Sequence, residues 1–158
     1  MTGWQANVMT VGWGGVCNSI PPCVCISVRP ATHTYHALME RKAFTLNLAT
    51  EDFTKEAAYC GRFSGKNVDK FKELGLTPIR SNVVDAPYIQ EFPINLACKI
   101  IQIHEIGSHT QFIGQVMDVE MDEALLQKDI SILEHLKPIV YGVGNDFGYY
   151  GIGKKISQ

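Results

Sequence analysis

The stretch NVMTVGWGGVCNSIPPCVCISVRPATHTY, residues 7–35, constrains the fold most, because glycine and proline set the limits of two β-type segments within it. Residues 7–11 have the pattern of a strand. It breaks at Gly12-Trp13-Gly14-Gly15, where glycine permits positive φ angles or close approach of the backbone to a ligand. The pair Pro21-Pro22 then restarts the chain in extended form. We therefore expect a strand on either side of a glycine-rich break.

From Cys23 onward the side chains alternate between two faces, as they do in a β-strand. Val24, Ile26 and Val28 share one face, and its apolar character predicts that this face is buried. The opposite face carries a different set of side chains, namely Cys23, Cys25, Ser27 and Arg29. Two thiols followed by a hydroxyl and a guanidinium fit neither an ordinary core nor an ordinary charged surface.

Ser27 and Arg29 lie roughly 6 to 7 Å apart near the end of this strand, which Pro30 stops. Thr32 or Thr34 can cap the short helix that follows. A helix start offers backbone N–H groups and a favourable dipole, and arginine matches two phosphate oxygens at once. The strand end is therefore a candidate phosphate site. The alternative is a solvated arginine beside an ordinary helix cap.

Composition limits the class of protein. A chain of 158 residues with 46% hydrophobic residues is long enough for one sizeable core, so we expect a single domain over residues 1–158. A net charge of -2 gives no electrostatic basis for binding nucleic acid or an anionic membrane. The sequence has neither an apolar run long enough to cross a bilayer nor a basic-then-apolar signal at its start. These features favour a soluble, cytoplasmic protein.

The five cysteines are odd in number and scattered, which favours reduced thiols over a disulfide framework. Cys23 and Cys25 share a strand face, and His33 and His36 are three residues apart, so a metal site must be considered. The Cys-x-Cys spacing lacks a second matching pair, and cysteines on apolar strands usually serve as small core residues. We predict no metal site.

Further strands are predicted at residues 43–48, 94–106 and 110–119, the last two as a hairpin with His109 at its tip. Asn47 is a polar amide on an apolar strand. It must bond neighbouring backbone or meet a ligand, and the residue pattern leaves both alternatives open.

Helical patterns are shorter. They cover a helix from Thr50 to Gly61, a turn and short helix ending at Gly75, and a helix or broken helix over residues 125–136. The tail from Tyr141 is interpreted as irregular. Several strands with few helical connections predict a mainly β fold, an antiparallel barrel with short peripheral helices, and not a Rossmann sheet.

Seven short motifs occur in a specific order and spacing along nearly the whole chain. They are N-V-M-T-V-x-W at 7–13, P-P-C-V-x-I-S-V-R at 21–29, T-Y at 34–35, F-T-L-N-L at 44–48, C-G-x-x-S-G-x-x-V-D-K-F at 60–71, G-L-T-P at 75–78 and H-T-Q-F at 109–112. Together they closely resemble the flavin reductase-like family with the FMN-binding split β-barrel, especially its flavoredoxin branch.

The resemblance implies a six-stranded Greek-key barrel that forms a homodimer, with FMN in a groove near the subunit interface. The residues matched to the isoalloxazine end of the site are Asn7, Met9, Thr10, Val11 and Trp13. Those matched to the phosphate end are Ser27, Arg29 and Thr34, and those that complete the site are Asn47, Ser64 and Lys70. His109 matches a family histidine near the flavin, which makes it a candidate catalytic residue, supplied from the same subunit or across the dimer.

Relative to the family, the chain is expected to be short at both ends. Members normally begin with another strand before a turn like residues 3–7 and continue beyond a segment like residues 151–158. An edge strand of the barrel would then lack its neighbour.

Three functions are consistent with this resemblance. Flavin supplies the redox chemistry, so the protein needs no nucleophile of its own and must place the ring against an electron donor. The first hypothesis is an NAD(P)H-dependent flavin reductase. The second is a flavoredoxin-type electron-transfer protein with a redox protein partner, and the third is a non-catalytic flavin-binding module.

Overall fold

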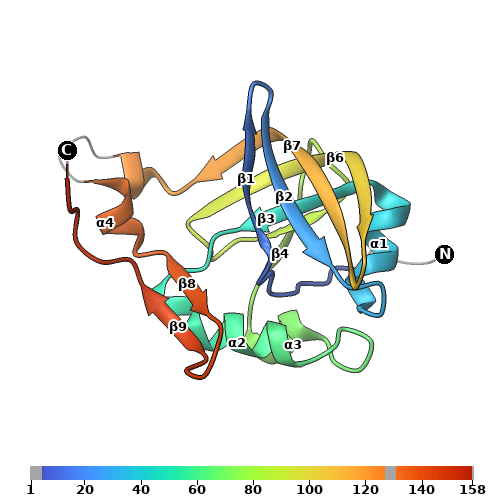
Figure 1. The fold of residues 1–158 in the computed structure, drawn as a ribbon, viewed down its shortest axis with the longest axis horizontal. Coiled ribbons are helices and arrows are strands. Elements are labelled where there is room, and N and C mark those ends of the chain that lie inside the picture. The colour runs from blue at the N-terminus through green and yellow to red at the C-terminus, as the bar shows by residue number, and fades with distance from the viewer. Residues whose placement is uncertain (1–4, 127–130, 158) are drawn as a thin grey trace.

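The computed structural model describes residues 5–126 and 131–157. Its main feature is a curved antiparallel sheet with the strand order β1-β2-β7-β6-β3 (Figure 1). In chain order the elements are β1 Gly14–Ser19, β2 Pro22–Val28, α1 His33–Arg41, β3 Ala43–Asn47, η1 Glu51–Phe53, α2 Thr54–Arg62, α3 Lys70–Leu74, β4 Pro78–Arg80, β5 Pro87–Ile89, β6 Ile94–Ile106, β7 His109–Met121, η2 Glu123–Leu126, α4 Ile132–Leu136, β8 Ile139–Gly142 and β9 Gly148–Gly151.

The core lies inside the curve of the sheet, where the predicted apolar face of β2 is buried. Val24, Ile26 and Val28 pack there with Phe44 of β3 and with the fully buried Phe112 of β7. Gly114 allows strand β7 to pack closely against the Phe44 ring in this core. A Cβ at Gly114 would lie 2.6 Å from Cζ of Phe44, so only glycine lets the ring pack against the strand without displacement.

The long hairpin is confirmed. Strands β6 and β7 pair from Ile94↔Met121 to Ile106↔His109, and Gly107 takes the positive φ of 52° that the turn requires. His109 is the first residue of β7, directly after the turn. The short helices are also confirmed, with α3 ending at the left-handed Gly75, whose φ is 65°.

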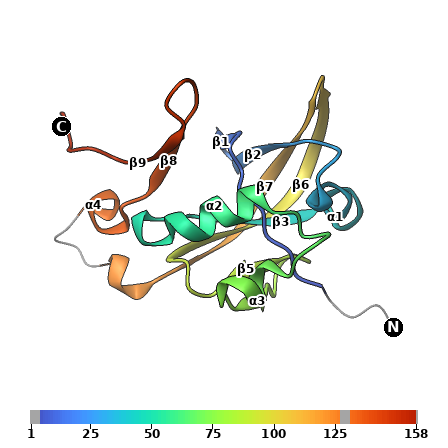
Figure 2. The same ribbon diagram turned by 90° about the horizontal axis from the view of Figure 1, so that it is seen from below.

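The strand predicted at residues 7–11 is wrong. These residues follow an extended path without ladder pairing and pass beside α2, α3 and β5, as Figure 2 shows from below. Their polar groups are bonded by side chains from distant parts of the chain. One such bond joins Nζ of Lys70 to the Val8 carbonyl. Because Lys70 is distant in the sequence, the alternation of residues 7–11 could not reveal this bond.

The tail predicted to be irregular contains the β8–β9 hairpin, so that prediction is wrong as well. Rings of Tyr141 and Tyr149 pack across the hairpin with centroids 5.1 Å apart. A bridge between Thr50 and Pro138 ties the hairpin to the start of η1. Of the helix predicted over residues 125–136, η2 and α4 form its two ends, and residues 127–130 lie outside the described residues.

The mainly β fold class with peripheral helices is confirmed. Within residues 5–126 and 131–157 the main sheet has five strands, whereas the resemblance implied a six-stranded barrel. None of the described helices has the length and apolar character needed to cross a membrane. In Figure 1, α2, α3 and the β8–β9 hairpin lie below the sheet, whereas α1 lies at its right-hand end.

Candidate functional site

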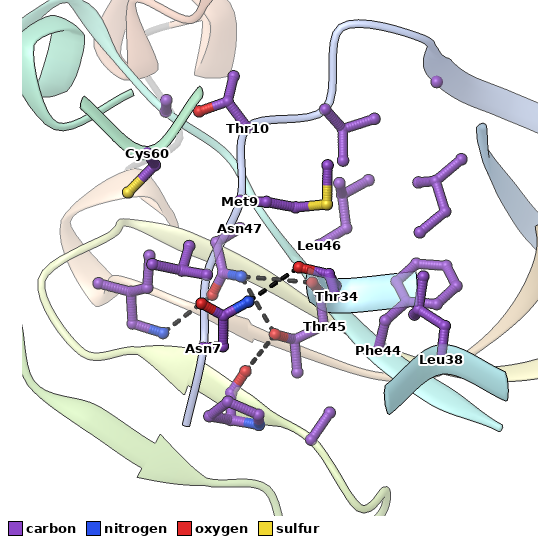
Figure 3. Close-up of a pocket in the computed structure, with 18 of the residues that line it drawn as sticks. Asn7, Met9, Thr10, Thr34, Leu38, Phe44, Thr45, Leu46, Asn47 and Cys60 are labelled. Carbon is purple, nitrogen blue, oxygen red and sulfur yellow. Dashed lines mark hydrogen bonds between the residues drawn. The ribbon is translucent and has the colours of Figure 1, made fainter. Parts of the chain in front are cut away.

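A cavity of about 690 Å³ lies beneath the N-terminal segment, bounded by α1, β3, α2 and the β8–β9 hairpin. Most of the residues around it are apolar, but polar side chains, including the charged Glu40, Arg41, Glu56 and Asp85, also line it. Figure 3 shows part of this lining. A volume and lining of this kind are typical of small-molecule sites. Six of the sequence-predicted site residues line this cavity, and we call them the cavity group: Asn7, Met9, Thr10, Val11, Thr34 and Asn47.

Asn47 lies on β3 and is bonded on both sides of its amide. Its Nδ2 donates to Oγ1 of Thr45 at 3.1 Å, and its Oδ1 accepts the backbone N–H of Ile89 at 2.9 Å. The Thr45 hydroxyl in turn donates to the Pro87 carbonyl. Asn47 therefore joins β3 to β5 while also lining the cavity, so the structure shows the bond to neighbouring backbone that the sequence left as one of two alternatives.

Asn7 ties the N-terminal segment to the first turn of α1. Its Nδ2 donates to Oγ1 of Thr34 at 2.8 Å, the contact drawn in Figure 3. Gly65 packs directly against it, since a Cβ there would overlap Oδ1 of Asn7 and lie 3.0 Å from Cδ2 of His33. The segment, the start of α1 and the loop with the exposed Ser64 thus meet at one edge of the cavity.

Lys70 is buried, with 4% of its surface exposed, and it does not line the cavity. Its Nζ donates to the carbonyls of Val8 and Cys60, both at 2.8 Å. Burial lowers the pKa of this ammonium group. Lys70 therefore fastens the N-terminal segment to the end of α2 from behind.

Four other predicted residues do not line the cavity, and we call them the outer group: Trp13, Ser27, Arg29 and His109. Ser27 alternates with the buried Val28, so it faces away from the core, and its N–H donates to the Trp13 carbonyl at 2.8 Å. The rings of Trp13 and His109 meet edge to face with centroids 6.4 Å apart. Nδ1 of His109 lies 2.8 Å from Oγ of Ser108.

Arg29 is exposed at the end of β2, three residues before the N-cap of α1. The ion pairs found within the described residues join Arg41 and Arg80 to Asp85, and Arg29 takes part in neither. The N-cap Thr32 makes no side-chain capping bond, because its hydroxyl donates to the Arg29 carbonyl at 2.9 Å. The start of α1 therefore keeps donor groups available beside a free guanidinium.

Sequence reasoning missed the cavity walls formed by α2 and the C-terminal hairpin. The missed residues include Glu56 and Cys60 of α2, Tyr141 of β8 and Tyr149 of β9. Oε2 of Glu56 is buried without a hydrogen-bond partner among the described residues, and burial raises the pKa of Cys60. The i, i+4 spacing of Glu56 and Cys60 was a usable signal, whereas nothing local marked the tyrosines.

Within residues 5–126 and 131–157, no three His, Cys, Asp or Glu side chains are grouped as metal ligands. The cysteines at positions 17, 23, 25, 60 and 98 are free thiols.

Comparison with known proteins decides the family. Residues 2–145 match the model of the flavin reductase like domain. The chain belongs to the flavin reductase-like family. This match covers both the cavity group and the outer group.

Three relatives illustrate the similarity. The structure of the flavoredoxin of Desulfovibrio vulgaris (Miyazaki F) is 40% identical, with a TM-score of 0.88 over 96% of this chain and 81% of that one. An FMN-binding protein from Thermus thermophilus shares the fold, at 19% identity and a TM-score of 0.78 over 96% and 82% of the two chains. An uncharacterized protein of Archaeoglobus fulgidus is 29% identical over 76% of this chain and 68% of its own length.

Proposed function

We propose that this flavin reductase-like protein binds FMN and transfers reducing equivalents through it. The observation that carries the proposal is the cavity of about 690 Å³, whose edge meets the start of α1 beside Arg29. FMN needs a large, mostly apolar surface for its ring system and an anion site for its phosphate. A relative of the same fold is named for FMN binding, and another is a flavoredoxin.

The residues present fit this cofactor. The start of α1 lacks a side-chain cap and offers N–H donors in a helix dipole, which suits a phosphate. Arg29 is exposed and adds a guanidinium that can bond two phosphate oxygens. Apolar side chains of Met9 and Val11 lie against the core at the cavity wall and can pack on a flat ring system.

We assign the individual residues as follows. The ring system contacts Asn7, Met9, Thr10, Val11 and Trp13, and the phosphate is held by Ser27, Arg29 and Thr34. Asn47, Ser64 and Lys70 complete the site. Lys70 acts through Val8, because its ammonium group is already engaged by two carbonyls.

Bound FMN supplies the hydride and electron chemistry at its ring. The chain's own residues bind and orient. Met9 and Val11 would exclude water, and Asn7 holds the segment to α1. The His109 ring meets that of Trp13, and its imidazole would donate or accept a proton at the bound flavin. His109 is therefore the candidate catalytic residue.

Two redox roles remain to be separated by experiment. The first is an NAD(P)H-dependent flavin reductase, which the family match favours. The second is a flavoredoxin-type electron-transfer protein that exchanges electrons with a redox protein partner, which the 40% identity to a flavoredoxin favours.

The purified protein should show the visible bands of flavin, or acquire them on addition of FMN. Under anaerobic conditions, prompt bleaching by NADH or NADPH supports the reductase. Bleaching by dithionite but not by either nicotinamide supports the electron-transfer protein. A protein that takes up no FMN contradicts the proposal. If such a protein binds another flavin, the hypothesis of a non-catalytic flavin-binding module remains.

We further propose that the protein is a single-domain homodimer in the cytoplasm. Val16 on the edge strand β1 and Ile20 in the turn that follows it are 85% and 90% exposed, and such exposed apolar side chains favour burial against a second copy. The free thiols fit a reducing compartment. Light scattering coupled to gel filtration should give twice the mass of one chain, and a monomer would contradict the dimer.

A further inference from the structure

One carboxylate oxygen in the wall of the cavity has no hydrogen-bond partner. Glu56 lies in the first turn of α2 and lines the cavity. The residue is half-buried, but its Oε2 atom is buried, and no group within residues 5–126 and 131–157 bonds to that atom. Buried polar atoms are nearly always satisfied in folded proteins, so this oxygen requires an explanation.

The face of α2 that carries Glu56 packs against the segment assigned to the flavin ring. Glu56 and Cys60 are four residues apart and share one face of the helix, with the buried Ala57 beside them. All three line the cavity. The Thr10 hydroxyl donates to the Ala57 carbonyl, and Thr10 and Cys60 are both seen in the upper part of Figure 3. A ligand that contacts Thr10 therefore lies against the face of α2 that carries Glu56.

The described part of the chain supplies no partner for this oxygen. Lys70 bonds to the end of α2, but its Nζ donates to two backbone carbonyls. The ion pairs found among the described residues involve Asp85 and not Glu56. Tyr141 and Tyr149 also line the cavity, and neither of them bonds to this oxygen. An unpartnered buried carboxylate oxygen is costly, so a group from a bound ligand is the partner that the site favours.

The chemistry of the carboxylate selects the kind of partner. An ionised carboxylate only accepts hydrogen bonds, so its partner must be an N–H or O–H donor. The ring system of oxidised flavin carries a single N–H group, at N3, and its other ring nitrogens and its carbonyl oxygens are acceptors. The phosphate of FMN has the same sign of charge as Glu56 and is repelled by it, which favours the end of the site at Arg29.

We propose that Glu56 orients the flavin ring by accepting a hydrogen bond from its N3–H. This inference rests on the proposed function, because it requires FMN in the cavity. It adds a binding residue that lies outside all seven sequence motifs. A carboxylate beside the ring also disfavours added negative charge there, so Glu56 lowers the reduction potential of bound FMN.

The test compares FMN with 3-methyl-FMN, in which a methyl group replaces the N3 hydrogen. In fluorescence titrations the unsubstituted protein should bind FMN at least about 10-fold more tightly than 3-methyl-FMN. Glu56→Ala should lose this preference, because it removes the acceptor. Glu56→Gln keeps an acceptor oxygen and should retain part of the preference. Glu73→Gln removes a charge at an exposed site on α3, and this matched control should keep the full preference.

Two further measurements separate an orienting role from a structural one. Glu56→Gln should shift the reduction potential of bound FMN to a more positive value, and spectroelectrochemistry measures this shift. Without flavin, Glu56→Gln should unfold at the same or a higher temperature than the unsubstituted protein, because an uncompensated carboxylate does not stabilise the fold. A lower unfolding temperature would show that Glu56 is bonded within the fold, and would overturn the proposal.

Failure of this inference can be told apart from failure of the proposed function. Equal affinities of the unsubstituted protein for FMN and 3-methyl-FMN, or an unchanged preference in Glu56→Ala, would overturn the role of Glu56 while FMN binding stands. A protein that takes up neither flavin would contradict the proposed function itself, and this inference with it.

Discussion

The cavity group and the outer group come from the same family motifs, but they differ in how their polar atoms are used. Asn7 and Asn47 in the cavity group are bonded to Thr34, Thr45 and Ile89 within the chain. In the outer group, Arg29 is exposed and takes part in neither ion pair of the described residues. The comparison teaches that the asparagines of the cavity group hold the site together, whereas Arg29 of the outer group is available to meet a charged ligand.

The largest expected effect tests the anchor behind the cavity group. Lys70→Met should lower the free energy of unfolding by about 3 kcal/mol, because a buried carbonyl of Cys60 and a partly buried carbonyl of Val8 lose their charged donor. Urea unfolding measures this loss. Lys72→Met is the matched control on the exposed face of the same helix and should change stability by less than about 0.5 kcal/mol. Equal losses of stability in Lys70→Met and Lys72→Met would show that the two hydrogen bonds of Lys70 do not stabilise the fold.

The second prediction concerns the outer group. Arg29→Ala should weaken FMN binding by about 1.5 to 3 kcal/mol, which is roughly 10- to 150-fold in Kd, while stability stays the same. Flavin fluorescence titration measures the affinity. Riboflavin, which lacks the phosphate, should bind both forms equally well. Arg62→Ala, at an exposed site on α2, is the control, and an unchanged FMN affinity of Arg29→Ala would remove Arg29 from the site.

The third prediction tests how closely the segment and the loop pack. Gly65→Ala should destabilise the protein by about 1 to 2 kcal/mol and weaken FMN binding, since the new methyl group must displace Asn7 or His33. Thermal unfolding and titration measure the two effects. Gly12→Ala adds a methyl group with nothing within 4 Å and should be neutral or slightly stabilising. Identical behaviour of the two variants would mean that the loop moves away freely.

The smallest expected effect is at Thr34. Thr34→Val keeps the shape of the side chain but removes the oxygen that Asn7 bonds, so the free energy of unfolding should fall by about 1 kcal/mol. Thr34→Ser retains the hydroxyl and should restore most of the difference. Because Thr34 is also assigned to the phosphate, FMN affinity should fall as well. An unchanged stability of Thr34→Val would show that its bond to Asn7 contributes nothing to folding.

Local patterns were enough to predict much of the fold. Alternation over Val24, Ile26 and Val28 predicted the buried face of β2, and Gly107 marked the turn of the β6–β7 hairpin. The same reasoning failed for residues 7–11, because alternation alone does not show whether a segment finds a strand to pair with. The β8–β9 hairpin was missed because its stabilising contacts, Tyr141 with Tyr149 and Thr50 with Pro138, lie between residues without a local strand signal.

The candidate site was predictable as a list of residues but not as an arrangement. Motif order alone brought Asn7, Thr34 and Asn47 into one list, and the structure brings these three to one cavity. Motif order could not show that Lys70 is buried. Its partners are backbone carbonyls, and because every residue has a carbonyl, no side-chain pattern marks them. Alternation put Arg29 on the outward face of β2, but only the structure shows that the cavity is lined by Ile26 from the opposite face.

The engagement of Lys70 gives this protein a built-in reporter for chemical footprinting. Acylating reagents attack lysine amines that reach solvent, so Lys66 and Lys72, which are exposed, should be labelled early. The amine of Lys70 becomes accessible only when residues 7–11 detach from α2. The rate of acylation of Lys70 therefore measures how often residues 7–11 move away from the cavity.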